Sequence, residues 1–418
     1  MTATTNTSLT TTASPTTSFE ISTPIGTNVN TTTNALLTTT ASPSTSIKIT
    51  TSFENMSSVT VNPCHGVDSQ AIETTLLYGN ASAVLCNFSI TEYACSSVAV
   101  LSTDDLAKVL TCKLTGSIKY PQEVWKLFFH NFPAPLDEAL DKVYNVTLSS
   151  VEADPSILNA IGEVIINEFT ATQLKNATFV NKWFQMKLRP FLSSVSIDFL
   201  SSLSSKKFSC ETYQIVVKAL SSQESLMKVE QKQSVVTSFI FPFLSRADLP
   251  DPGCVSNTYG SNNWLEKNLG KFSNYAPLDQ IKILNANFSS VAVLGLLSSE
   301  QKAQFILQPD SGVLGNDSVF REVFSSVITS LGRNQLGSFF TVFHQTAIQM
   351  NMTSIPSAIS HTILNMTLLD LVPHFQSFSP GDFALWFQTY LSFFLSGIGP
   401  NTLSIIPMNI SCDSYREM

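Results

Sequence analysis

The chain has 418 residues and a net charge of −8, and 43% of its residues are hydrophobic while only 13% are charged. This length fits two ordinary domains or one repeat array. The mild negative charge argues against nucleic acid and against an anionic membrane surface as partners, because both call for basic patches. The charged share is about half that of an ordinary soluble chain, so something other than charge must keep the protein soluble.

Residues 1–62 differ in composition from the rest of the chain. They are dominated by Thr and Ser with scattered Pro, and the phrase LTTTASPTTSFEI at 9–21 returns as LTTTASPSTSIKI at 37–49. Such a segment cannot bury enough apolar surface to offset the entropy cost of ordering it. We therefore predict a disordered, mucin-like, O-glycosylated stalk over residues 1–62, with an unmodified flexible linker as the alternative.

Segments that would direct the chain to a membrane are not visible in the sequence. No apolar run reaches the roughly 20 residues that cross a bilayer. Thr- and Ser-rich sequence follows Met1 directly, and the chain closes on the polar hexapeptide DSYREM. We expect an internal piece of a longer protein or a chain with incomplete ends, so that membrane contact would require an anchor outside this chain.

N-glycosylation sequons of the form Asn-X-Ser/Thr are frequent. Three lie in the predicted stalk, at Asn6, Asn30 and Asn55. Roughly half as many as the folded part contains would arise by chance, so the excess indicates an extracellular location. Glycans would also supply the solubility that charge does not. The sequons of the predicted folded part begin at Asn80, Asn87, Asn145, Asn176, Asn287, Asn316, Asn351, Asn365 and Asn409.

An internal repeat runs through the rest of the chain. The decamer WFQMKLRPFL at 183–192 returns as WFQTYLSFFL at 386–395, and the motif Ser-Cys-X-X-Tyr follows both copies. Upstream of each decamer lies the phrase SSVAVL, at 96–101 and at 289–294. A unit of about two hundred residues thus occurs twice, and we place the units at 63–253 and 254–418, the second cut short at its C-terminal end.

The seven Cys residues are expected to form disulfides. None belongs to a Cys-X-X-Cys motif or lies at zinc-ligand spacing from a His. With the predicted stalk and the sequons, disulfides are favoured over the buried free thiols of a cytosolic protein. The repeat predicts that Cys210 pairs with Cys254 at the junction of the units, which leaves Cys412, the equivalent of Cys210, without a partner in this chain. Four others are expected to pair among themselves in an order that stays open: Cys64, Cys86, Cys95 and Cys112.

The repeated unit has the periodicity of helices. In the first decamer the apolar residues fall on one face of a 3.6-residue period, and DSVFREVFSSVI at 317–328 carries an i, i+4 apolar stripe. We expect Asp317 to cap that helix and Ser298-X-X-Gln301 to form a capping box. The acidic pairs Asp104-Asp105 and Asp137-Glu138 are expected at helix N-termini. Strict alternation is rare outside short runs such as VIINEF, which argues against strands.

These patterns predict an all-α fold. Many short helices combined with long-period repetition favour an α-solenoid, a superhelical array of the armadillo or HEAT kind in which each unit buries its apolar face on the next. The Trp-Phe stripe of the decamer is then the packing seam of the array rather than a ligand-binding aromatic box.

The first decamer and the segment after it also carry a recognisable pattern. The pattern begins with an aromatic residue, Phe and Gln, followed by Leu and then by Phe-Leu. A Ser-rich spacer, Leu-X-X-Leu-Ser and the start of a helix come next. In this pattern the chain resembles the mesothelin family, which includes stereocilin and otoancorin, over about residues 64–418. The pattern is carried here by Trp183, Phe184, Leu188, Phe191, Leu192, Leu200, Leu203, Ser204, Ser209 and Tyr213.

The resemblance implies a superhelix of short helices, an extracellular location, membrane anchorage in the full chain and a role in cell–cell or cell–matrix attachment. It implies no catalytic residues. The chain departs from the family's pattern in having no visible anchor and in carrying the mucin-like segment in front.

Residues for catalysis are not indicated. The sequence holds no His-Glu-X-X-His, no Gly-X-Ser-X-Gly and no P-loop. The adjacent Cys64 and His65 suggest a thiol–imidazole pair, but neighbours in sequence rarely form a catalytic dyad, and Cys64 is better explained by a disulfide. We therefore expect no catalytic residue, no metal ligand and no cofactor.

The function that these features favour is that of a non-enzymatic extracellular glycoprotein, secreted or held at the cell surface. Its helical superhelix would bind a partner glycoprotein, a glycan or a matrix component, and it would not bind nucleic acid. Two alternatives remain: a structural mucin-like surface coat without a specific ligand, and a secreted enzyme of an unrecognised type.

Overall fold

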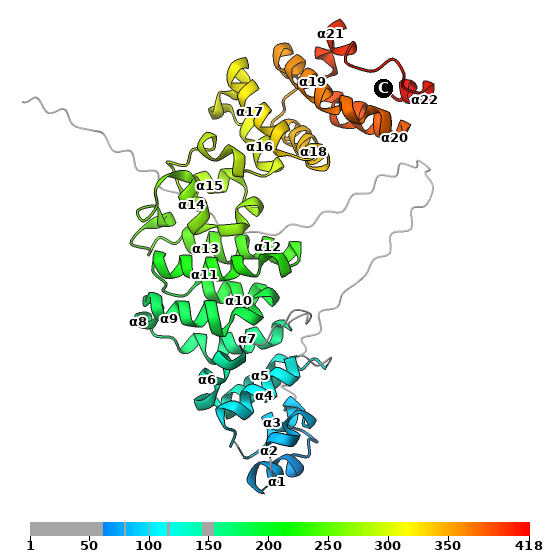
Figure 1. The fold of residues 1–418 in the computed structure, drawn as a ribbon. Helices are drawn as coiled ribbons and strands as arrows, with labels where there is room; N and C mark the ends of the chain where they lie inside the picture. Colours follow the sequence, from blue (N-terminus) through cyan, green and yellow to red (C-terminus); the bar gives the residue numbers. More distant parts are fainter. Residues whose placement is uncertain (1–61, 79–80, 99, 115–117, 144–153) are drawn as a thin grey trace, which may run out of the picture. The chain divides into compact units, whose positions relative to one another are not determined.

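The computed structural model describes residues 62–78, 81–98, 100–114, 118–143 and 154–418, so nearly all of the predicted stalk lies outside it. Of the described residues 74% are helical and none forms a strand, which confirms the all-α prediction. Figure 1 shows these short helices, each lying beside its neighbours in chain order. In the described part of the chain every helix is too short or too polar to span a bilayer.

The elements up to the first decamer are short, and those labelled η are 3₁₀- or π-helices. They are α1 (Gln70–Tyr78), α2 (Ala81–Val84), η1 (Leu85–Asn87), α3 (Ile90–Cys95), α4 (Thr103–Leu114), α5 (Gln122–Asn131), α6 (Pro133–Val143), α7 (Pro155–Val164), η2 (Ile166–Glu168), α8 (Ala171–Leu174), α9 (Ala177–Asn181), η3 (Lys182–Lys187) and η4 (Arg189–Ser194).

The middle of the chain continues in the same way. Its elements are α10 (Ile197–Ser204), α11 (Cys210–Ser222), η5 (Glu224–Leu226), α12 (Val229–Ser234), η6 (Val235–Ile240), α13 (Phe241–Leu244), η7 (Pro252–Cys254), α14 (Gly260–Asn268), η8 (Gly270–Tyr275), α15 (Leu278–Leu284), η9 (Val291–Leu296), α16 (Ser299–Leu307), η10 (Pro309–Ser311) and η11 (Val313–Gly315).

Three longer helices precede the second decamer. The last elements are α17 (Asp317–Ser330), α18 (Arg333–Gln349), α19 (Ser357–Leu371), η12 (Val372–Ser377), α20 (Pro380–Ala384), η13 (Leu385–Tyr390), η14 (Ser392–Gly397), α21 (Pro400–Leu403) and α22 (Cys412–Glu417).

Packing joins elements that are close in chain order. In the first unit α4 packs against α6, α6 against η3 and η3 against α11, while α3 packs against α5 and α5 against α7. In the second unit α16 packs against α18, α17 against α19, and α18 against η13. The predicted boundary at 253/254 is crossed by contacts between α11 and α14 and by the pair Cys210–Cys254.

The repeated decamer folds the same way in both copies. Each begins with a π-helical turn, in which the amide of Leu188 donates to the carbonyl of Trp183 at 2.9 Å and the amide of Leu391 donates to that of Trp386 at 2.8 Å. A 3₁₀-helix follows in each copy. Because a π-turn inserts one extra residue, the two aromatic residues and the later Phe can face the same core.

The apolar positions of the first decamer are buried, which confirms that its Trp-Phe stripe belongs to the core. At roughly 1.5–3 kcal/mol for each large apolar side chain, this stripe is a major source of local stability. The buried positions are Trp183, Phe184, Leu188, Phe191 and Leu192.

A third π-turn occurs where the sequence alone did not reveal a copy. In η6 the amide of Phe241 donates to the carbonyl of Val236, and Pro242-Phe243-Leu244 follows as Pro190-Phe191-Leu192 follows η3. The repeated motif is therefore shorter than the two-hundred-residue unit. By this hydrogen bond Val236 stands at the place of Trp183 and Thr237 at that of Phe184, which hides the match in the sequence.

Helix capping confirms two predictions and corrects two. Ser298 and Gln301 form the predicted capping box, and Asp104 and Asp105 lie in the first turn of α4. The predicted cap Asp317 is wrong. Asn316 caps α17, because its Oδ1 accepts from the amides of Ser318 at 3.1 Å and Val319 at 3.3 Å.

The second correction concerns Asp137 and Glu138. These acids do not lie in the first turn of their helix, because Pro133, with its fixed φ, opens α6 four residues earlier. Asp137 faces a lysine of the first decamer instead.

Candidate functional site

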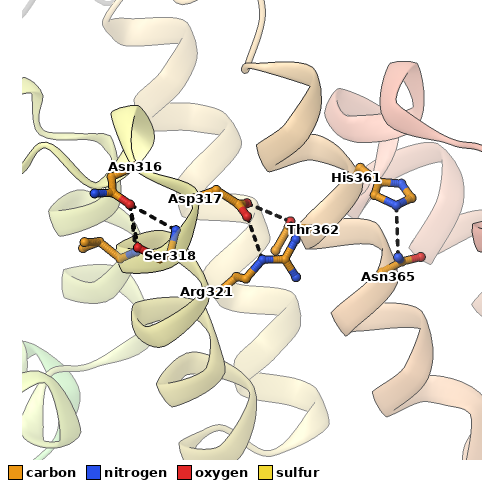
Figure 2. Close-up of polar contacts among 8 residues, drawn as sticks. Asn316, Asp317, Ser318, Arg321, His361, Thr362 and Asn365 are labelled. Atoms are coloured by element: carbon orange, nitrogen blue, oxygen red, sulfur yellow. Dashed lines mark hydrogen bonds and ion pairs between the residues drawn. The ribbon is translucent and has the colours of Figure 1, made fainter.

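The described residues contain no group of three or more His, Cys, Asp or Glu placed to hold a metal ion. The thiol of Cys64 is paired with Cys95, so it does not act with His65. Two networks of polar side chains lie on and around α17 and α19, and Figure 2 shows part of each.

The first network ties α17 to α19. Arg321 Nε donates to Asp317 Oδ2 at 2.7 Å, and Arg321 Nη2 donates to Thr362 Oγ1 at 2.7 Å. Thr362 Oγ1 in turn donates to Asp317 Oδ1 at 3.1 Å, which closes a triangle. The hydrogen bond from Arg321 lowers the pKa of Asp317; desolvation opposes it, and a smaller contribution from Thr362 adds to the lowering.

The second network joins α19 to η14 and α21. Asn365 Nδ2 donates to His361 Nε2 at 3.2 Å, so the imidazole carries its proton on Nδ1, which faces Gly397 O at 3.4 Å and Thr402 Oγ1 at 3.3 Å. Thr402 Oγ1 donates to Asn365 Oδ1 at 2.9 Å. Each polar atom of this ring has a partner in one consistent assignment of protons.

The chemistry open to these networks is limited. Thr402 beside His361 is the nearest approach to a hydroxyl–imidazole pair, but Thr402 is fully buried, so no substrate reaches its oxygen. The hydroxyls of Ser360 and Thr367, on the buried side of α19, have no hydrogen-bond partner among the described residues. The arrangement holds α17, α19 and α21 together and offers no exposed nucleophile.

An ion cluster around the buried Lys187 holds the first decamer against α6. Lys187 is 1% exposed; its Nζ lies 2.9 Å from Asp141 Oδ2 and 3.2 Å from Asp137 Oδ1, and 5.3 Å from the centre of the Trp183 ring. Partial burial raises the pKa of Asp141, but hydrogen bonds from Lys187 and Lys182 outweigh it and hold that pKa below 3.8. All carboxylates here are matched to ammonium groups, as in a structural cluster.

A second buried lysine has no carboxylate beside it. Lys302 on α16 is 1% exposed and its Nζ contacts the hydroxyl of Ser330 on α17. Desolvation lowers the pKa of Lys302. A buried ammonium without a carboxylate beside it in the described residues destabilises the fold.

The sequon asparagines fall into two groups. Asn80 and Asn145 lie outside the described residues. Asn365 is half-buried, and both ends of its amide are hydrogen-bonded. Six others are exposed to solvent: Asn87, Asn176, Asn287, Asn316, Asn351 and Asn409.

Helix capping accounts for part of this sequon pattern. Asn176 and Asn316 cap α9 and α17 through Oδ1, while Ser89 and Ser411, the hydroxyl residues of two other sequons, cap α3 and α22. Asn and Ser are favoured at N-caps for their oxygen acceptors. A cap that uses Oδ1 leaves the Nδ2 atom of Asn176 or Asn316 available for a glycan.

The described cysteines form three pairs at disulfide distance. Cys210 and Cys254 pair as the repeat predicts, with Cα atoms 5.4 Å apart. The order that the sequence left open is Cys64 with Cys95 and Cys86 with Cys112, with Cα separations of 5.4 and 5.9 Å. Cys412 is free and exposed.

No protein-family model, no curated protein and no solved structure matches this chain. The resemblance to the mesothelin family therefore stays a prediction from the residues that carry it.

Proposed function

We propose that this chain is the non-catalytic folded region of an extracellular glycoprotein, preceded by a mucin-like stalk over residues 1–62, that mediates cell–cell or cell–matrix attachment. The observation that carries the proposal is the pairing of six of the seven cysteines at disulfide distance. Disulfides form and persist in oxidising compartments outside the cytosol.

The exposure of the sequons supports the same location. Six sequon asparagines present their side chains to solvent, and glycans there would offset a charged share of only 13%. The proposal predicts glycans at exposed sequons such as Asn287. It predicts none at Asn365, because a glycan on its Nδ2 would displace His361 from the amide.

The proposed way in which the protein attaches to a partner is supported by the order in which its helices pack along the chain. Helices that contact near neighbours along the chain are typical of a superhelical solenoid, whose extended lateral face suits a large partner. We propose such a face as the binding surface for a glycoprotein, a glycan or a matrix component. The mesothelin-like pattern between Trp183 and Tyr213 supports this class of function.

The test is the mass of the native protein from its own tissue, recovered without reduction, before and after N- and O-glycosidase treatment. A large mass loss and six oxidised cysteines are expected. An unchanged mass with free thiols would overturn the proposal, since it would place the chain in a reducing compartment. Binding of the glycosylated full chain to intact cell layers then separates attachment from a passive surface coat, which would show no saturable binding.

A further inference from the structure

A small cavity lies where η12, α20 and the start of α22 meet. Its volume is about 180 Å³. The apolar wall is formed by Phe375, Phe378 and Phe383, whose ring centres lie 5.4–5.6 Å apart. Gln376 and Asn409, both exposed, also line it.

We propose that this cavity receives the first N-acetylglucosamine of a glycan attached to Asn409. The inference rests on the proposed function, because the glycan is added only in the secretory pathway. In that step the amide nitrogen of Asn409 bonds to the anomeric carbon of the sugar. The bond from that carbon to a lipid-linked diphosphate breaks, and one amide proton is released.

The position of Asn409 supports this occupant. Asn409 begins the sequon Asn409-Ile410-Ser411, and all three of these residues line the cavity. In the described part of the chain the amide of Asn409 has no hydrogen-bond partner. Ser411 is held at the start of α22, where its Oγ accepts from the amide of Ser414 at 3.0 Å and donates to Ser414 Oγ at 2.8 Å. A sugar on Asn409 therefore begins at the cavity and needs no long linker to reach it.

The composition of the cavity suits a pyranose ring that carries an acetamido group. The three phenylalanine rings, 1–8% exposed, contribute a narrow apolar surface of fixed orientation against which the C–H face of a sugar can pack. The amide of Gln376 can donate to and accept from the polar edge, and Ser411 Oγ, whose proton goes to Ser414, keeps one lone pair to accept from it. At 180 Å³ the cavity is smaller than the roughly 300 Å³ of sites that enclose a drug-sized ligand, so it holds one ring and leaves the rest of the glycan in solvent.

The experiment compares two sequons in the secreted full-length chain. Asn287 is the control, since it is exposed and its side chain has no hydrogen-bond partner in the described residues. A peptide amidase that cuts between asparagine and the first sugar is applied to the native protein, and release is followed at each site by mass spectrometry of the peptides. We expect release from Asn409 to be about tenfold slower than from Asn287, and equal after denaturation, because only a docked sugar requires local opening.

Two variants test the wall and the rim. Phe378→Leu keeps the wall apolar but removes an aromatic face, and Gln376→Ala changes only an exposed side chain, which keeps the test usable if the first variant fails to fold. Each should speed release at Asn409 without changing release at Asn287. Trimming to a single N-acetylglucosamine should leave the thermal midpoint unchanged, while Asn409→Gln should lower it.

The outcomes separate this inference from the function beneath it. If neither Asn287 nor Asn409 carries a glycan, the extracellular proposal fails and the inference fails with it. If Asn287 is glycosylated while Asn409 is unmodified, or is released at the same rate, the cavity does not hold the sugar and the extracellular proposal stands.

Discussion

The two decamers place different chemistry on the same backbone. In the first copy Lys187 lies against Trp183 and pairs with Asp137 and Asp141 of α6. In the second copy the equivalent of Lys187 is Tyr390, which packs edge-on against Trp386 with ring centres 5.1 Å apart. The two copies therefore share the backbone path and the buried apolar residues. The helix that faces each copy determines whether Lys187 or Tyr390 fits beside the Trp.

The helix that faces each decamer changes to match. The register Leu136, Ala139, Leu140 of α6 corresponds to Leu336, Phe339, Phe340 of α18, with all six side chains buried. In this register Asp137 becomes Gly337, and a Cβ at Gly337 would lie 3.0 Å from the Tyr390 ring. One position of the facing helix therefore holds Asp137, which pairs with Lys187, in the first unit. In the second unit it holds Gly337, which leaves room for the ring of Tyr390.

A second pair of positions shows the reverse exchange. Leu101-Ser102 before α4 and Leu297-Ser298 before α16 occupy equivalent positions. In this alignment Lys302 of α16 is the equivalent of Leu106 of α4. Both side chains are buried. The second unit thus has a buried ammonium where the first has a leucine. This occurs although the second unit is poorer in charged residues, with 17 in residues 254–418 against 34 in residues 63–253.

The largest expected effect comes from the disulfide Cys210–Cys254 at the junction of the units, whose equivalent Cys412 is unpaired in the second unit. The double variant Cys210→Ala with Cys254→Ala opens a disulfide that spans 44 residues, which should lower the unfolding free energy by about 4 kcal/mol through loop-closure entropy. Urea unfolding of the unreduced full chain measures this. Cys412→Ala is the matched control and should change stability by less than about 0.5 kcal/mol. Equal effects of the two variants would show that the pair does not clamp the unit.

Next comes the exchange at the decamer. Lys187→Tyr places the second copy's residue in the first and should cost about 2 kcal/mol, because Asp137 loses its ammonium partner while Asp141 keeps only Lys182. Adding Asp137→Gly removes one of those carboxylates and opens a notch, so a double-mutant cycle should give a favourable coupling of about 1 kcal/mol. Strictly additive losses would mean that the two positions do not act as a pair.

Replacing the buried Lys302 should stabilise the fold, in contrast to the two preceding variants. Lys302→Leu copies the residue of the first unit and should raise the unfolding free energy by about 1–2 kcal/mol, since the isolated ammonium is desolvated without a carboxylate. The reciprocal variant Leu106→Lys is the control and should destabilise the chain. A loss of stability in Lys302→Leu would indicate that the contact with Ser330 outweighs the desolvation.

The same lysine predicts a pH dependence. Its pKa in the folded state is lowered from 10.5, so the destabilisation is fully present below the folded pKa. As pH rises from the folded pKa towards 10.5, the unfolded chain binds more protons than the folded one and stability increases. The difference in unfolding free energy between the wild type and Lys302→Leu should therefore shrink with rising pH in that window. A constant difference would contradict it.

Part of this structure could be predicted from the sequence. Apolar periodicity predicted the helices and the buried stripe from Trp183 to Leu192, because burial follows the 3.6-residue period. The repeat gave the pair Cys210–Cys254, because equivalent cysteines occupy equivalent helix starts. The other two pairs required the path of the chain, since four cysteines allow three connectivities.

The polar networks were beyond sequence reasoning for a different reason. Asp317 and Arg321 have the i, i+4 spacing of an ion pair, which was a usable signal. Thr362 and Thr402, which complete the two networks, come from helices whose approach no local pattern encodes. The π-turns were missed as well, because the same apolar residues fit an ordinary helix.

The smallest expected effect distinguishes two sequons of the second unit. Asn365→Ala should cost about 1–2 kcal/mol, because it leaves His361 Nε2 without a partner and removes the acceptor of the buried Thr402 hydroxyl proton. Asn287→Ala, at an exposed sequon whose side chain makes no hydrogen bond in the described residues, should stay within about 0.5 kcal/mol. Both chains are compared by thermal unfolding after enzymatic deglycosylation, so that a lost glycan does not enter the difference. Equal midpoints would mean that solvent replaces Asn365 at no cost, and the ring of hydrogen bonds would then have no part in holding α19 to α21.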